Sequence, residues 1–98
     1  MITSKQRAYL RSLANKVQPT IQVGKEGVSR NFTKQLEVIL EKHELVKVNV
    51  LENSGLTAKE AGIDTARYTK SELVQSIGRK FTLYRPSKED PQIELPNK

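Results

Sequence analysis

The sequence contains no cysteine, no tryptophan and a single histidine among its 98 residues. Without cysteine, the chain has no disulfide framework, no thiolate ligand for a metal and no thiol nucleophile. His43 has no second histidine and no cysteine with which to form a metal site or a Cys–His catalytic pair. We expect its imidazole to cap carbonyl groups near the end of a helix or to face solvent. The sequence therefore predicts no metal centre and no cofactor.

Long hydrophobic runs are also missing. The longest apolar runs have three residues, such as residues 38–40, whereas a membrane-spanning helix needs about 20. The first residues are polar and charged, unlike the apolar region of a secretory signal. The lack of cysteine agrees with a reducing compartment. We expect a soluble, cytoplasmic protein with no membrane partner.

The sequence motifs of common enzyme classes are absent. No Gly-x-Ser-x-Gly sequence presents a nucleophilic serine. The glycine pair at positions 24 and 27 is not a nucleotide-binding loop of the form Gly-x-x-x-x-Gly-Lys-[Ser/Thr]. The carboxylates are scattered along the chain, as is typical of a solvated surface that balances lysine and arginine. We therefore expect no enzymatic activity and no small-molecule substrate.

The charge that is present is positive and unevenly placed. The net charge is +6, and residues 1–35 hold seven Lys/Arg against one acid. A later cluster contains Arg79, Lys80 and Arg85. A basic excess of this kind favours a polyanionic partner such as a nucleic acid, although it can also serve only solubility.

The most informative segment is a glycine turn between a short apolar strand and a helix. Gly24, Lys25, Glu26 and Gly27 follow an expected strand at 20–23 and precede Ser29, a helix N-cap candidate. Glycine lets the backbone take a positive φ and approach another backbone closely. Amide groups at a helix N-terminus suit a phosphate, and Lys25 adds a positive charge. The pattern favours a grip on a sugar-phosphate backbone, while the alternative is a turn without a ligand.

The remaining periodicity predicts three helices and four strands. Thr3 with Gln6 and Thr57 with Glu60 form capping-box patterns that begin two of the helices. Valines at 46, 48 and 50 alternate with polar residues, as in a half-buried strand. The expected order is helix 4–16, strand 20–23, helix from 29 to about 44, strand 45–51, loop 52–55, helix from 57, and strands 73–77 and 80–85. A short helix over residues 71–76 is an alternative to the third strand. The fold class is α/β, a compact α-β-α-β-α-β-β sandwich with a mixed four-stranded sheet.

Residues 86–98 differ in composition from the rest of the chain. Three of the four prolines (Pro86, Pro91 and Pro96) fall there, between charged and polar residues. Such a composition is typical of a mobile tail with little to bury. We expect a domain at residues 1–85 followed by a mobile, proline-rich tail at 86–98.

Four basic residues outside the turn are candidates to extend its charge. Arg30 and Lys34 lie one turn apart near the start of the second helix, and Arg7 and Arg11 flank the apolar stripe of the first. The five aromatic residues are sparse and mostly suit packing, and no RNA-recognition-motif signature is present. Binding is therefore expected to depend mainly on backbone and shape.

Two separated motifs resemble those of a known family. Residues 23–28, containing the glycine turn, and residues 72–85, containing Gly78-Arg79 and Tyr84-Arg85, are similar to the CRM (chloroplast RNA splicing and ribosome maturation) domain. The resemblance covers about residues 1–86, and the length is similar to that of the small bacterial YhbY/YqeI proteins. It implies a fold like the C-terminal domain of translation initiation factor three. It also implies RNA contact through Gly24, Lys25, Glu26 and Gly27, where Glu26 departs from an all-basic tip.

The resemblance implies association with precursors of the large ribosomal subunit. We therefore expect a non-enzymatic protein that binds ribosomal RNA during large-subunit assembly, through residues of the turn and the two helices (Gly24, Lys25, Glu26, Gly27, Arg30, Lys34, Arg7 and Arg11). The alternative is a protein-interaction adaptor whose basic surface meets an acidic partner on the ribosome or an assembly factor.

Overall fold

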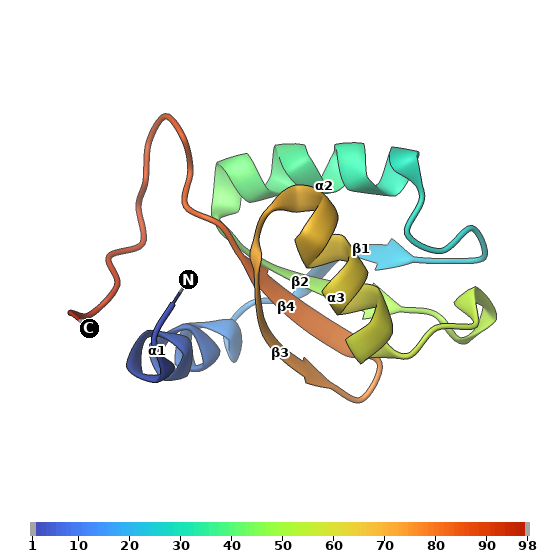
Figure 1. Ribbon diagram of the computed structural model, residues 1–98, viewed down its shortest axis with the longest axis horizontal. Helices are drawn as coiled ribbons and strands as arrows, with labels where there is room; N and C mark the ends of the chain where they lie inside the picture. The colour runs from blue at the N-terminus through green and yellow to red at the C-terminus, as the bar shows by residue number, and fades with distance from the viewer. Residues whose placement is uncertain (1, 98) are drawn as a thin grey trace.

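The computed structural model describes residues 2–97 and shows a mixed α/β fold (Figure 1). Residues 72–77 form a strand, so the alternative of a short helix over 71–76 is wrong. The elements are α1 (Ser4–Ala14), β1 (Pro19–Val23), α2 (Arg30–His43), β2 (Leu45–Val50), the 3-10 helix η1 (Glu52–Ser54), α3 (Ala58–Thr69), β3 (Glu72–Ile77) and β4 (Lys80–Tyr84). None of the helices within the described residues is long and apolar enough to cross a membrane.

Side-chain caps explain where the helices begin. At α1, Thr3 Oγ1 accepts a hydrogen bond from the Gln6 amide at 3.1 Å, and Gln6 Oε1 accepts one from the Thr3 amide at 3.0 Å. Thr57 and Glu60 repeat this reciprocal arrangement at α3. Each box satisfies two backbone donors that the helix itself leaves without acceptors. Both capping boxes are therefore confirmed. The first helix ends at Ala14, two residues before the expected boundary.

The sheet has the strand order β1-β2-β4-β3. β1 runs parallel to β2, because α2 carries the chain back between them, and the other two pairings are antiparallel. Helices α2 and α3 cover one face of the sheet, and α1 packs on the opposite face at one end (Figure 1).

Alternation along the strands sends side chains into two separate cores. Val46, Val48 and Val50 belong to the larger core with α2 and α3, while Leu45 belongs to a smaller one with Leu10 of α1. The larger core depends on a close approach of α3 to the sheet. A Cβ on Gly62 would lie 2.8 Å from Leu73 Cδ1 and 3.2 Å from Phe81 Cγ.

The C-terminal segment, residues 86–97, packs against the domain. Ile93 and Leu95 contact the smaller core, and Gln6 Nε2 donates a hydrogen bond to the Pro96 carbonyl at 2.9 Å. The expectation that this tail has little to bury is therefore wrong. The smaller core is covered by α1 on one side, and the two apolar residues of the segment close it on another.

Two glutamates at the end of α2 hold the segment in place. Glu44, only 1% exposed, accepts hydrogen bonds from the backbone amides of Ser87, Gln92 and Ile93, each at 2.8 Å. Glu41 accepts from the amide of Lys88 at 3.0 Å. Burial by itself would raise the pKa of Glu44, but the three amide donors outweigh it and lower that pKa.

Candidate nucleic-acid interface

The glycine turn is a tight turn with a charged tip. The Gly27 amide donates to the Gly24 carbonyl at 2.9 Å, which places Lys25 and Glu26 at the exposed tip. Gly27 has φ +69°, a conformation that glycine adopts without strain. A Cβ on Gly24 would meet Leu51 only at an ordinary distance of 3.8 Å. The conformation therefore requires glycine at position 27 but not at position 24.

The turn leads directly into the N-terminus of α2. Ser29 Oγ accepts a hydrogen bond from the Phe32 amide at 3.1 Å, so the predicted N-cap is confirmed. Arg30 and Lys34 are exposed on the first two turns of the helix. Positive side chains at this end oppose the helix dipole and slightly disfavour the helix, by a few tenths of a kcal/mol each. An anionic ligand would offset that cost.

A shallow depression lies beside the turn, and three uncharged side-chain amides line part of it. Gln22 of β1 and Asn31 and Gln35 of α2 form its polar wall next to the glycine turn. Gln22 and Gln35 also line an adjoining hollow that extends along β1 to Asn49. The turn is therefore continuous with a polar surface at the edge of the sheet.

Tyr68 is an exposed aromatic residue, one of the five that were expected mostly to suit packing. It is 66% exposed and shares a hollow with Val28, Ser29, Arg30 and Thr33 at the start of α2. At 100° per residue, Tyr68 falls at the border of the face that buries Ala61 and Thr65. A helical wheel centred on that face is the signal that could have placed it outside the core.

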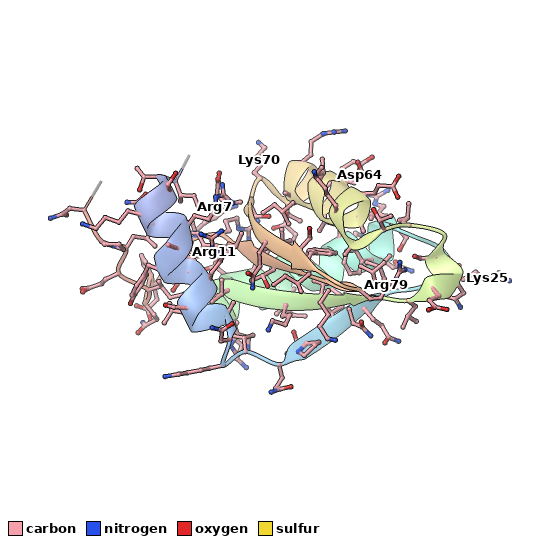
Figure 2. The ribbon with its side chains drawn as sticks, turned by 90° about the horizontal axis from the view of Figure 1, so that it is seen from below. Arg7, Arg11, Lys25, Asp64, Lys70 and Arg79 are labelled. Atoms are coloured by element: carbon pink, nitrogen blue, oxygen red, sulfur yellow. The ribbon has the colours of Figure 1, made fainter. Side chains whose placement is uncertain are left out.

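Arg7 and Arg11 lie far from the turn. They are on α1, at the opposite end of the molecule's long axis from Lys25 (Figure 2). Arg7 Nη1 donates to the carbonyls of Leu73 and Val74, and its guanidinium lies 4.0 Å from the carboxylate of Glu72. Arg7 therefore ties α1 to β3, and the structure does not bring these two arginines into one track with the turn.

The late basic cluster is also mostly engaged within the fold. Arg79 donates to the carbonyls of Val50, Leu51 and Leu56 at 2.8 to 3.0 Å. Arg85 pairs with Glu37 and donates to the Thr69 carbonyl at 2.9 Å. Lys80, by contrast, is exposed on β4.

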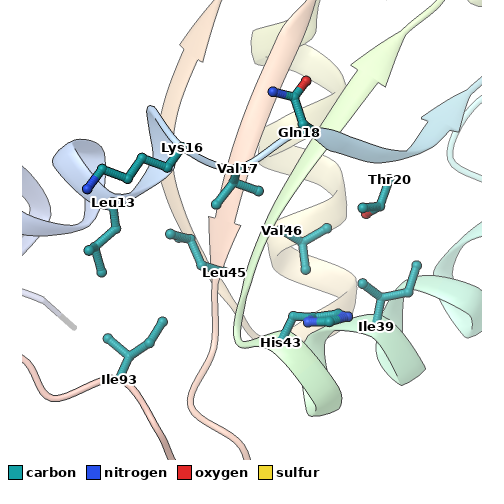
Figure 3. Close-up of a pocket in the computed structure, with 10 residues that line it drawn as sticks. All are labelled: Leu13, Lys16, Val17, Gln18, Thr20, Ile39, His43, Leu45, Val46 and Ile93. Carbon is teal, nitrogen blue, oxygen red and sulfur yellow. The ribbon is translucent and has the colours of Figure 1, made fainter.

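An apolar hollow of about 430 Å³ lies at the other end of α2, away from the glycine turn (Figure 3). Leu13 and Val17 line it from one side, and Ile39 and His43 from another. Within residues 2–97, no group of three or more His, Cys, Asp or Glu side chains is placed to hold a metal ion. His43 is exposed at the end of its helix, as expected.

The sequence profile of the CRS1 / YhbY (CRM) domain matches residues 2–85. This chain belongs to the CRM domain family. The CRM match ends where the C-terminal segment begins, and it includes both motifs on which the resemblance was based.

Relatives cover nearly the whole chain. The "Probable RNA-binding protein YqeI" of Bacillus subtilis is 45% identical over 98% of this chain and 100% of its own length. An "RNA-binding protein" of Haemophilus influenzae is 35% identical over 99% of this chain and 97% of its own. The solution structure of the Staphylococcus aureus protein SAV1595 superposes with a TM-score of 0.79 at 44% identity, covering 98% of this chain and 100% of that one. The CRM fold of this chain is thus shared with a solved structure.

Proposed function

We propose that this protein binds RNA, with the glycine turn and the first turns of α2 as the site. The observation that carries the proposal is the placement of three exposed cations, Lys25, Arg30 and Lys34, around a tight turn that opens directly into a helix N-terminus. The names of the Bacillus subtilis and Haemophilus influenzae relatives, a probable RNA-binding protein and an RNA-binding protein, support the same ligand.

The geometry fits a phosphate at the turn and a nucleoside beside it. Gly27 keeps the backbone clear of a Cβ, and the lysine and arginine side chains supply charge that a phosphate attracts. The exposed ring of Tyr68, next to Arg30, offers a face on which one base can stack. The protein acts here as a binding module without chemistry of its own.

Ribosomal RNA in precursors of the large subunit is the RNA that we propose. The support is the CRM family membership, which implies that role by resemblance, and the net charge of +6. The proposal places the protein in the cytoplasm, where such particles assemble.

The test is the salt dependence of binding to protein-free ribosomal RNA fragments. Single-stranded RNA loses about 0.7 in log affinity per unit of log salt for each neutralised phosphate, so the three cations predict a slope of about −2 or steeper. An affinity that does not change with salt overturns the proposal. Equal binding to polyglutamate would also overturn it and would favour an adaptor for an acidic protein.

A further inference from the structure

The sheet face that carries α1 is only partly covered. The helix packs over Leu45, Val74 and Tyr84 at one end of this face. The rest of the face extends from α1 toward the glycine turn, as the view from below shows (Figure 2). We define the open sheet face by the strand side chains that are at least partly exposed on it beyond α1: Gln22, Lys47, Asn49, Gln75, Ile77 and Lys80. Thr82 belongs to the same side of the sheet but is only 1% exposed.

The strand register aligns these side chains in two rows. Gln22 is opposite Asn49, Asn49 is opposite Lys80, and Lys80 is opposite Ile77. In the second row, Lys47 is opposite Thr82, which is opposite Gln75. Directly opposed residues on neighbouring strands lie about 5 Å apart, so the first row is one continuous surface. In the second row, Thr82 is buried between Lys47 and Gln75.

The open sheet face combines amides with positive charge. Among the strand residues that the structure describes, the charged ones on the open sheet face are Lys47 and Lys80. The one strand residue with a carboxylate, Glu72, lies beside Arg7 of α1 and is not part of this face. The hydrogen bonds found within residues 2–97 do not use the side-chain amides of Gln22, Asn49 or Gln75. Both donors and acceptors of these amides therefore remain available to a ligand.

The face is hollowed where it meets α1. A depression of about 360 Å³ lies between the C-cap residue Asn15 and the β3–β4 hairpin. Lys47, Gln75 and Lys80 line it, and Ile77, 68% exposed, adds an apolar wall.

We propose that the open sheet face binds a single-stranded RNA segment that continues from the glycine turn. Gln22 is the link, because it lines both the depression at the turn and the hollow that reaches Asn49. The proposal rests on the proposed function and adds to it a second contact surface and a means of base recognition.

The chemistry of the face matches unpaired bases. Each side-chain amide can donate to and accept from the edge of a base, and the two lysines can neutralise phosphates on either side. Ile77 can contact the apolar face of a base. In duplex RNA the deep major groove hides the base edges, so the match is to single strands.

The test uses random single-stranded RNA octamers. The fraction that binds the protein is sequenced, and the affinities of the enriched octamers are measured at several salt concentrations. Gln22→Ala is expected to reduce the preference for the enriched octamers about five- to tenfold, the range of one hydrogen bond, without changing the salt slope. Lys80→Ala is expected to make the slope of log affinity against log salt less steep by about 0.7. Gln92→Ala and Lys88→Ala, in the C-terminal segment, are the matched controls and should change neither quantity.

A second measurement uses the wild-type protein. On addition of an enriched octamer, the side-chain amide NMR signals of Gln22, Asn49 and Gln75 are expected to shift, while that of Gln92 stays in place. No shift at the three amides overturns the proposal, as does an acidic peptide that shifts them when RNA does not.

The two proposals fail in different ways. Salt-dependent binding that Lys25→Ala weakens, with no effect of Gln22→Ala or Lys80→Ala, overturns the open sheet face and leaves the proposed function intact. The open sheet face is also overturned if the wild-type protein enriches no octamer sequence and the side-chain amide signals of Gln22, Asn49 and Gln75 do not shift. If the wild-type protein shows no salt-dependent RNA binding, the proposed function is overturned, and the open sheet face with it.

Discussion

Glu44 is a single side chain on which the position of the C-terminal segment depends. It has φ +66°, and its buried carboxylate accepts three backbone amides from residues 87, 92 and 93. A charge removed from water is costly unless hydrogen bonds compensate it, and here the segment provides them. Glu44 and the segment therefore stabilise each other.

The lowered pKa of Glu44 predicts a share of the acid sensitivity of the fold. A carboxyl with a depressed pKa in the folded state stabilises it fully above the unfolded value, about 4.5, and loses that contribution as pH falls through the folded value. Glu44→Gln should cost about 1–3 kcal/mol at pH 7, because its amide group replaces an oxygen that accepts N–H donors. Urea unfolding at pH 7 and at lower pH measures both effects. A variant as stable as the wild type at pH 7 would contradict this account.

Gly62 is a residue at which helix propensity and packing make opposite predictions. Alanine is about 1 kcal/mol more favourable than glycine inside a helix. Its Cβ would, however, lie 2.8 Å from Leu73 Cδ1 and 3.2 Å from Phe81 Cγ, and overpacking costs about 1–3 kcal/mol. We expect Gly62→Ala to lower the free energy of unfolding by about 1 kcal/mol. A rise in the unfolding midpoint would show that the core yields easily at this point.

Among the elements, the C-terminal segment is the one whose role differs most from its composition. Deleting residues 86–98 is expected to destabilise the domain, since it uncovers the smaller core around Leu10 and Tyr84 and leaves the Glu44 carboxylate without amide partners. Thermal melting of the truncated protein measures the loss. In the full chain, the amides of Gln92 and Ile93 should exchange slowly with solvent. Fast exchange at both, with unchanged melting after deletion, would restore the picture of a mobile tail.

The elements that were predicted correctly are those with local signals. Thr3 and Thr57 begin helices through contacts three residues away, and β2 is marked by alternation within six residues. The packing of the C-terminal segment could not be predicted in this way, because Glu44 and Ile93 are 49 positions apart. Prolines and charges dominate the composition there and obscure the pair Ile93 and Leu95.

In the candidate site, too, the local contacts were predicted and the long-range ones were not. The turn at 24–27 and the cap at Ser29 are contiguous in sequence, so the sequence places them together. Whether α1 joins them depends on which end of the sheet it packs against, and the flanking charges of a helix carry no information on that. Arg7 was therefore assigned to RNA, although its guanidinium contacts β3.

Across the whole molecule, the cations differ in whether the fold itself engages them. The group around the glycine turn is exposed, whereas arginines elsewhere, such as Arg79 and Arg85, satisfy carbonyls and a carboxylate of the fold. The molecule is 39 Å long, whereas the Debye length at physiological salt is about 8 Å, and the turn and α1 lie toward opposite ends of the long axis (Figure 2). Charges at the two ends should therefore act independently on a bound RNA.

This separation predicts that Lys25→Ala changes RNA binding without changing stability, and that Arg7→Ala changes stability without changing RNA binding. Lys25→Ala should weaken binding to ribosomal RNA by about 1 kcal/mol and reduce the salt slope by about 0.7, with unchanged melting, because it removes one exposed charge at the turn. Arg7→Ala should lower the free energy of unfolding by about 1–2 kcal/mol, since the Leu73 carbonyl loses a donor. Its RNA affinity and salt slope should match those of the wild type at a temperature where both are folded. If Arg7→Ala reduces the salt slope while Lys25→Ala does not, the RNA binds over α1, and the glycine turn does not contact it.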